Sequence, residues 1–259
     1  MKFSGYILSI TIITLLLTII GCAQSTPQKP EAKTNSEPIK LATLPPGIHQ
    51  LTVAVPSGNL LRYTISIPPK LKPENPVPLI IALHYGYSGK LTPFYGGSFV
   101  KQLVKPAFEE LDAVIIAPDV LSDGDWTTQT NEQAVVWLTQ IVLKLYPVNP
   151  KKVLITGFSM GAIGTWYIGK RHQDLFTAAI PVGGKPVDGD LNWTIPVYVI
   201  HSKKDEILPF EPTQKYVEKL KANGANIEFK IIDNLTHYET SRYVKPLKET
   251  QSWLNLVWK

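Results

Sequence analysis

Residues 152–161 read KVLITGFSMG. The aliphatic first half has the composition of a buried strand, and the residues after Gly161 have the composition of a helix. Ser159 stands between Gly157 and Gly161, so the pattern Gly-x-Ser-x-Gly falls at a strand-to-helix turn. Such a sharp turn strains the backbone of its serine and needs neighbours with almost no side chain. The pattern predicts a nucleophilic Ser159, with the Met160 amide beside it as a donor to an oxyanion.

Outward from this turn, strand patterns alternate with helix patterns. Apolar or alternating runs predict strands at residues 51–55, 61–67, 77–83, 113–117, 152–156, 178–182, 197–200 and 227–232. Helical periodicity predicts helices at residues 130–146, 213–223 and 246–257. The first of these should be capped by Thr130 with Gln133 and stopped by Pro147. We therefore expect an α/β fold, with a mostly parallel central sheet, helices on both faces and an opening antiparallel hairpin.

The N-terminal residues have the pattern of an export signal. Residues 6–20 are almost continuously apolar and lead to Gly21 and Cys22, the only cysteine of the chain. This segment resembles the lipobox of bacterial lipoproteins, which implies that Cys22 is acylated and becomes the first residue of the mature protein. An uncleaved anchor and a plain signal peptide are the alternatives. Ala23 follows the cysteine, so the resemblance implies an exported lipoprotein in the outer rather than the inner membrane.

The sequence predicts three parts: a signal peptide at residues 1–22, a disordered tether at residues 23–46 and one globular domain at residues 47–259. The tether is rich in Ser, Thr, Pro, Lys and Glu. The whole chain is 44% hydrophobic, which is enough for a full core, and its formal charge of +5 includes no basic cluster that would indicate nucleic-acid binding. Because the only cysteine belongs to the signal, no disulfide is expected in the domain.

The order of these elements around Ser159 resembles the α/β-hydrolase superfamily, over residues 51–258. Within it, the chain is similar to compact single-domain esterases related to feruloyl esterases, polyhydroxyalkanoate depolymerases and dienelactone hydrolases. Dienelactone hydrolases use a cysteine nucleophile, whereas this chain has a serine, which places it on the esterase side. Residues 182–195 are too few for the cap domain that many lipases insert there.

In this superfamily the triad follows the order serine, acid, histidine. The acid should follow a late strand, and Asp205 lies just beyond the strand predicted at residues 197–200. Glu206 is the alternative acid; otherwise its side chain should point to solvent. Asp119 also follows a strand, but we expect it to be structural. Ser202 stands where similar chains carry glycine, which leaves the shape of this loop open.

The base should lie beyond the last strand, and His237 is placed there, 32 residues after Asp205. The resemblance implies that Asp205 holds one ring nitrogen of His237 while the other faces the serine. His49 and His172 lie elsewhere in the predicted fold, and His201 ends a strand beside the acid loop. A zinc site of His201, Asp205 and His237 is conceivable, but the spacing lacks a tight ligand pair. We therefore expect neither a metal nor a cofactor.

The second oxyanion amide should come from the loop after the strand at residues 77–83. Related esterases carry a His-Gly-Gly motif there, and this chain has His84, Tyr85 and Gly86. The amide of Tyr85 or that of Gly86 should point to the oxyanion, and the sequence leaves both open. We expect His84 to anchor the loop through hydrogen bonds.

Aromatic side chains in the loops suggest how a substrate binds. Phe94, Tyr95 and Trp126 fall on the carboxyl side of the predicted sheet, where ligands bind in α/β folds. They could stack on a sugar or an aryl group, or they could simply pack the loops. Without a cap, the cleft suits an ester on a bulky molecule.

These observations predict a serine hydrolase that cleaves a carboxylic ester, of bulky, carbohydrate or aryl type, through an acyl-enzyme outside the cytoplasm. Its expected partners are that ester and, through the lipid on Cys22, a membrane. A serine peptidase of the prolyl-oligopeptidase kind would share the triad but carries a propeller that the sequence lacks. A non-catalytic binding lipoprotein on the same fold is the second alternative. The oligomeric state is not indicated.

Overall fold

The computed structural model describes residues 44–121, 124–187 and 189–259. The signal expected at residues 1–22, its Cys22 and the tether up to residue 43 lie outside the described residues. Within the described ranges, no helix is both long enough and apolar enough to cross a membrane.

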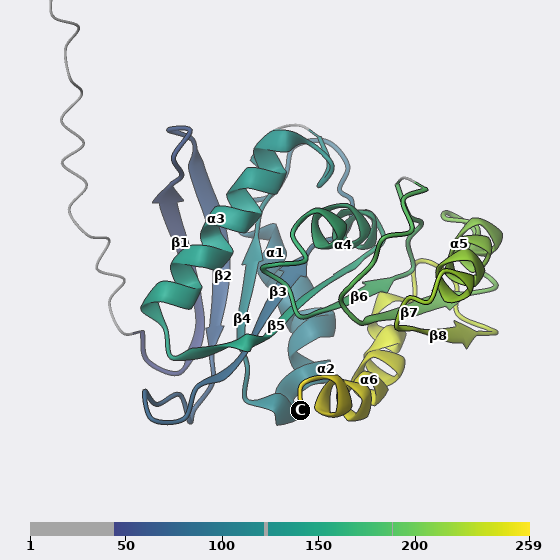
Figure 1. The fold of residues 1–259 in the computed structure, drawn as a ribbon. Coiled ribbons are helices and arrows are strands. Elements are labelled where there is room, and N and C mark those ends of the chain that lie inside the picture. The colour runs from purple at the N-terminus through teal and green to yellow at the C-terminus, as the bar shows by residue number, and fades with distance from the viewer. Residues whose placement is uncertain (1–43, 122–123, 188) are drawn as a thin grey trace, which may run out of the picture. The chain divides into compact units, whose positions relative to one another are not determined.

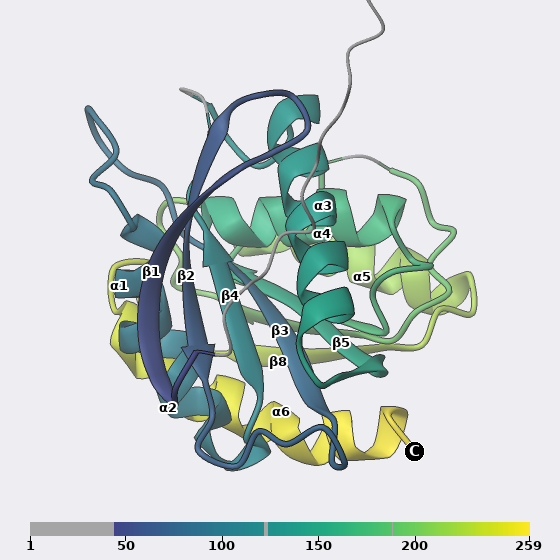
Figure 2. The ribbon, with the colours of Figure 1, turned by 90° about the vertical axis from the view of Figure 1, so that its left-hand side faces the viewer.

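The described chain forms a sheet of eight strands in the order β1-β2-β4-β3-β5-β6-β7-β8 (Figure 1). Figure 2 shows the part of this sheet from β1 through β2, β4 and β3 to β5. The strands β1 and β2 form an antiparallel hairpin, β2 is antiparallel to β4, and every other neighbouring pair is parallel. The fold class predicted from the sequence is therefore confirmed. The strands are β1 (Gly47–Ala54), β2 (Leu60–Ile67), β3 (Val77–Leu83), β4 (Val114–Pro118), β5 (Val148–Phe158), β6 (Ala178–Val182), β7 (Val197–Ser202) and β8 (Ile227–Ile232).

Helices cover both faces of this sheet (Figure 1). The side chains of successive strand residues point to opposite faces, so Leu79 and Ile81 belong to one hydrophobic cluster while Ile80 and Ala82 belong to the other. The first cluster includes side chains from α3 (Gln129–Leu145), α4 (Met160–Arg171) and α5 (Phe210–Ala222). The second includes side chains from α1 (Tyr95–Phe99), α2 (Lys105–Phe108) and α6 (Val244–Val257).

The start of α3 differs from the prediction. Its N-cap is Thr128, whose hydroxyl accepts a hydrogen bond from the Asn131 amide at 3.4 Å, and not Thr130. Thr128 has the extended backbone that a capping residue needs, whereas Thr130 is already helical. The helix ends at Leu145, one residue before the predicted end, because Tyr146 precedes a proline and is extended.

A helical segment at residues 95–111 was not predicted. There α1 continues through a π-helical turn (Val100–Val104) into α2 and a 3₁₀ turn (Glu109–Leu111). Gly96 and Gly97 read as a loop in the sequence, but they lie against the sheet. A Cβ atom on Gly96 would be 2.7 Å from the Ala117 carbonyl oxygen, so only glycine allows this contact.

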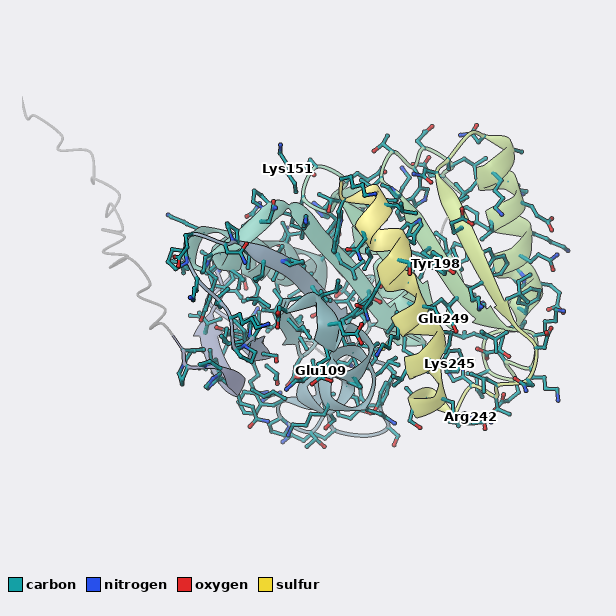
Figure 3. All side chains as sticks on the ribbon, turned by 90° about the horizontal axis from the view of Figure 1, so that it is seen from below. Glu109, Lys151, Tyr198, Arg242, Lys245 and Glu249 are labelled. Atoms are coloured by element: carbon teal, nitrogen blue, oxygen red, sulfur yellow. The ribbon has the colours of Figure 1, made fainter. Side chains whose placement is uncertain are left out.

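The helix α6 lies across the underside of the sheet, with Arg242 in the 3₁₀ turn (Thr240–Tyr243) before it (Figure 3). Beneath it, the Tyr198 ring of β7 packs edge-on against Trp253. The outer charges of α6 include two ion pairs, Lys230 with Glu249 at 3.0 Å and Lys248 with Glu110 at 2.7 Å. This face of the domain therefore carries mixed charge.

The carboxyl ends of β3, β4, β5, β7 and β8 are followed by the turns and loops that hold the predicted site residues. In a parallel sheet these ends meet at one edge, which is where ligands bind in open α/β folds. The connection from β6 to β7, at residues 183–187 and 189–196, contains no helix among its described residues.

Candidate active site

Ser159 occupies the sharp turn between β5 and α4. Its backbone has φ 57° and ψ −119°, a left-handed conformation that costs free energy in a residue with a side chain. Three hydrogen bonds hold it there: its amide donates to the Val182 carbonyl at 3.0 Å, and its carbonyl accepts from Ala162 and Ile163. The turn keeps Ser159 at the edge of the sheet, at the start of the helix.

Two glycines make this turn possible. A Cβ atom on Gly157 would lie 2.3 Å from the Gly161 carbonyl oxygen, and a Cβ atom on Gly161 would lie 1.9 Å from the Leu83 carbonyl oxygen. Both distances are far below van der Waals contact. The two glycines of the sequence pattern are therefore required because strand, helix and the neighbouring β3 approach one another so closely.

The structure brings Ser159, His237 and Asp205 into one hydrogen-bonded chain. The Nε2 atom of His237 lies 2.7 Å from the Ser159 hydroxyl oxygen. The Nδ1 atom lies 2.8 Å from one Asp205 carboxylate oxygen and 2.9 Å from the other. A neutral imidazole with its proton on Nδ1 satisfies both contacts, since Nδ1 then donates to the carboxylate and Nε2 accepts from the hydroxyl. His237 is only 5% exposed, so water competes little for these bonds.

Asp205 is buried but well supplied with donors. The amides of Ile207 and Leu208 donate to one carboxylate oxygen at 3.1 and 2.8 Å. Burial alone would raise the pKa of Asp205, but the hydrogen bonds from His201, His237 and the Leu208 amide outweigh it and hold the pKa well below its usual range. Asp205 is therefore charged at neutral pH and keeps the Nδ1 proton of His237 in place.

Glu206 does not point freely to solvent as the sequence suggested. Its carboxylate accepts a hydrogen bond from the backbone amide of His237 at 3.0 Å. Asp205 thus holds the ring of His237 while Glu206 holds its main chain. The sequence left Glu206 open as the alternative acid of the triad. Glu206 does not contact the ring nitrogens of His237, so it does not occupy that position.

His201 lies beside the acid and is fully buried. Its Nε2 atom is 2.9 Å from the Leu208 carbonyl oxygen and 3.3 Å from an Asp205 oxygen, so its N–H is shared between the two. Among the described residues, no group of three or more His, Cys, Asp or Glu side chains is arranged to hold a metal ion. His201 therefore serves the carboxylate of Asp205 as a hydrogen-bond donor.

Hydrogen bonds from side chains to its carbonyl groups hold the loop after β3 in place. The Trp126 indole donates to the His84 carbonyl at 2.9 Å, and the His84 ring donates from Nδ1 to the Tyr85 carbonyl at 2.8 Å. The other His84 nitrogen accepts from the Val120 amide at 3.4 Å. Burial lowers the pKa of His84, so the ring stays neutral with its proton on Nδ1. His84 thus anchors the loop, as the sequence suggested.

An open cleft of about 600 Å³ contains Ser159 and His237. Its rim includes two exposed apolar surfaces, Ile207 at 46% and Tyr238 at 75% exposure. The remaining residues of its lining are Tyr85, Gly86, Tyr87, Ser88, Tyr95, Phe158 and Thr240. No Asp, Glu, Lys or Arg side chain is part of this lining.

Two of the three aromatic residues predicted to bind substrate do not line this cleft. Trp126 is only 1% exposed and packs in the core, so it cannot stack on a ligand; its indole braces the loop after β3 instead. Phe94 has a left-handed backbone, φ 60°, and its amide donates to Asp119 at 2.7 Å. Tyr95 does line the cleft, and Tyr85, Tyr87 and Tyr238 join it there.

Residues 125–244 match the Dienelactone hydrolase family. "Probable feruloyl esterase C" from Aspergillus niger is 26% identical over 190 residues, which are 71% of this chain and 67% of that protein. "Protein usf" from Aquifex pyrophilus is 30% identical over 93 residues, which are 34% of this chain but only 40% of that protein. The chain therefore spans less than half the length of this second relative.

Solved structures show the same fold. The crystal structure of a thermostable esterase superposes with a TM-score of 0.70 at 21% sequence identity, and the superposition covers 80% of this chain and 62% of the other. At this identity the likeness concerns the fold, and the family match of residues 125–244 adds the sequence relationship. The chain has the α/β-hydrolase fold, and its residues 125–244 are similar to the Dienelactone hydrolase family.

Proposed function

We propose that this protein is a serine hydrolase that cleaves a carboxylic ester through an acyl-enzyme. The hydrogen-bonded chain of Asp205, His237 and Ser159 at the floor of an open cleft carries this proposal. The family match and the feruloyl esterase relative support ester hydrolysis.

In the first half of the reaction, the Ser159 hydroxyl oxygen attacks the ester carbonyl carbon while its proton moves to Nε2 of His237. The contact of 2.7 Å between these two atoms is within reach for this transfer. Asp205 stabilises the imidazolium that forms and keeps the ring oriented. The imidazolium then gives its proton to the leaving alcohol oxygen as the carbon–oxygen bond breaks. A water molecule repeats the sequence on the acyl-enzyme and releases the acid.

Two amides are suited to hold the oxyanion of the tetrahedral intermediates. Met160 is the first residue of α4, so its N–H has no carbonyl partner within the helix. In the loop after β3, the His84 carbonyl is directed toward the start of α4, because a Cβ atom on Gly161 would lie only 2.9 Å from its oxygen. The N–H of a trans peptide points opposite to its C=O, so the Tyr85 amide points away from α4.

The next peptide is oriented the other way. The Tyr85 carbonyl faces the buried His84 ring, which directs the Gly86 amide away from the core. Gly86 also lies beside Met160, since a Cβ atom on Gly86 would be 4.0 Å from the Met160 Cβ. Of the two candidates that the sequence left open, we therefore infer that Gly86 supplies the second oxyanion donor.

The lining of the cleft supports a neutral ester with an aromatic or otherwise bulky apolar group. Tyrosine rings and Ile207 offer stacking and apolar contact, and a substrate carboxylate would find no cationic Lys or Arg in the lining. With the cleft open, the part of the substrate beyond the reacting ester can extend into solvent. The substrate class thus inferred includes aryl esters and esters on carbohydrate.

A fluorophosphonate probe tests the enzyme directly. The purified domain should be labelled on Ser159, located by mass spectrometry of the modified peptide, and labelling should stop its hydrolysis of p-nitrophenyl acetate. Among substrates, neutral aryl esters should give a kcat/KM about tenfold above matched esters that carry a carboxylate on the aryl ring, since that charge would lose hydration against a lining without Lys or Arg. A protein that is neither labelled nor active on any ester of the panel would exclude the proposal.

We also propose that the chain is exported and anchored through a lipid on Cys22, as its N-terminal sequence suggests. In the producing bacterium, labelled palmitate should enter the full chain, and the protein should sediment with membranes. Cys22→Ser should abolish the palmitate label, because the sulfur that carries the acyl chain is then missing, and the unprocessed chain should keep its apolar residues 6–20. A chain that begins at Leu41 is the control and should remain in the soluble fraction. Its sedimentation with membranes would show that the domain itself binds them.

A further inference from the structure

Three successive carbonyl groups in the loop after β3 each accept a hydrogen bond from a side chain. Trp126 and His84 hold the carbonyls of His84 and Tyr85 from within the core. The third, that of Gly86, accepts from the Tyr95 hydroxyl at 3.3 Å. Tyr95 differs from the other two donors because it belongs to α1 and lines the cleft.

Tyr95 is itself held firmly in place. The residues before and after Tyr95 both donate hydrogen bonds from their amides to the buried carboxylate of Asp119, Phe94 at 2.7 Å and Gly96 at 3.0 Å. Arg62 pairs with the same carboxylate at 3.3 Å. Asp119 is therefore structural, as expected. It attaches the backbone around Tyr95 to the sheet near β2 and β4.

The ring and hydroxyl of Tyr95 suit a lasting contact with this loop. The ring meets His84 edge-on at 5.1 Å and Tyr85 at 5.4 Å between centroids. Burial, with the neighbouring Tyr85, raises the pKa of Tyr95 to about 12. The hydroxyl therefore keeps its proton and remains a donor through the pH range in which a histidine base works.

We propose that Tyr95 is a positioning residue of the oxyanion hole. The argument rests on the proposed function, in which the Gly86 amide holds the oxyanion. Gly86 has no side chain to restrict its backbone, so its conformation depends on the peptides at its two sides. His84 fixes the peptide before Gly86, and Tyr95 fixes the peptide after it. Together they hold the Gly86 amide in the direction that the transition state requires, before any substrate arrives.

The variant Tyr95→Phe tests this role because it removes the hydroxyl and keeps the ring. Deleting an oxyanion donor outright costs about 10² to 10³ in kcat, and a donor that is only loosened should cost less. We expect kcat on p-nitrophenyl acetate to fall about tenfold, with KM within about twofold of its original value. Affinity for an arylboronic acid, which forms a tetrahedral adduct on the serine, should weaken by about the same factor as kcat.

Tyr198→Phe is the matched control, since it makes the same chemical change on β7 beneath α6 (Figure 3). It should leave kcat and boronate affinity unchanged. If Tyr95→Phe keeps kcat and boronate affinity within twofold while the unaltered protein is active, the positioning role is wrong and the proposed function stands. A rise in KM alone would make Tyr95 a substrate contact and would also overturn the role. An unaltered protein without esterase activity would refute both proposals.

Discussion

Replacing Ser159 with alanine should lower ester turnover by a factor of at least about 10⁴. Without the hydroxyl there is no nucleophile for the acyl-enzyme, and the remaining oxyanion donors and His237 can only assist direct attack by water. The fold should persist, because alanine meets the same left-handed backbone at this turn as serine does. Initial rates on p-nitrophenyl acetate, with circular dichroism to verify folding, measure the effect.

The control is Ser252→Ala, a serine on the exposed side of α6. This variant should retain full activity. Turnover of Ser159→Ala above about one per cent of the original would mean that another group is the nucleophile, and fluorophosphonate labelling of that group would identify it.

The second large effect concerns Asp205. In Asp205→Asn the side chain keeps its shape, but its amide nitrogen can face Nδ1 of His237 and favour the tautomer with its proton on Nε2, which cannot accept the serine proton. In a serine protease the equivalent change lowers kcat by about 10⁴, and we adopt that scale as an upper bound because esters have better leaving groups than amides. Turnover should therefore fall by about 10² to 10⁴.

Changes at Glu206 should have much smaller effects. The glutamine oxygen of Glu206→Gln can still accept from the His237 amide, so turnover should fall less than about tenfold. Glu206→Ala loses that bond and should cost more than Glu206→Gln, yet stay far short of Asp205→Asn. Turnover of all three variants at one pH gives the comparison. A larger loss for Glu206→Gln than for Asp205→Asn would reverse the roles of the two carboxylates.

Much of the fold was predictable because the relevant signals are local. The strands of this sheet are β-branched, aliphatic runs, and a run such as residues 77–83 is buried on both faces whatever lies around it. The order of the elements then brings residues from separate loops to one edge, which is why Ser159, Asp205 and His237 could be proposed from the sequence. Gly157 and Gly161 were informative because the backbone approaches so closely at both positions that only glycine fits, and this requirement is visible in the sequence.

The remaining features depend on contacts between distant segments. Trp126 reads as a loop residue, and nothing in its neighbourhood indicates that its indole is buried against His84. Residues 95–111 escaped prediction because Gly96 normally disfavours helix, whereas here its missing side chain allows contact with Ala117. The bond from His237 to Glu206 joins loops 31 residues apart, and no spacing rule predicts which carboxylate oxygen will meet which amide.

Residue 202 is a serine where the resemblance implied a glycine, and its surroundings explain why a serine fits. Ser202 ends β7 without a positive φ and is fully buried. Its hydroxyl accepts from the Lys204 amide at 3.2 Å. Serine is accommodated, and the loop still delivers Asp205 to His237.

The connection between β6 and β7 has a consequence for how this scaffold could diversify. Its beginning is fixed, because the Gly184 carbonyl accepts from Trp166 and Thr213, and its end is fixed by the buried Trp193. Between them, Lys185, Val187 and Gly189 are exposed. Extra residues could enter among these exposed positions without moving a strand. Those added next to Gly184 would start close to the active site, since a Cβ atom on Gly184 would lie 2.9 Å from the Ser159 carbonyl oxygen. New substrate ranges could thus be acquired or engineered by lengthening one loop, while the reacting groups stay as they are.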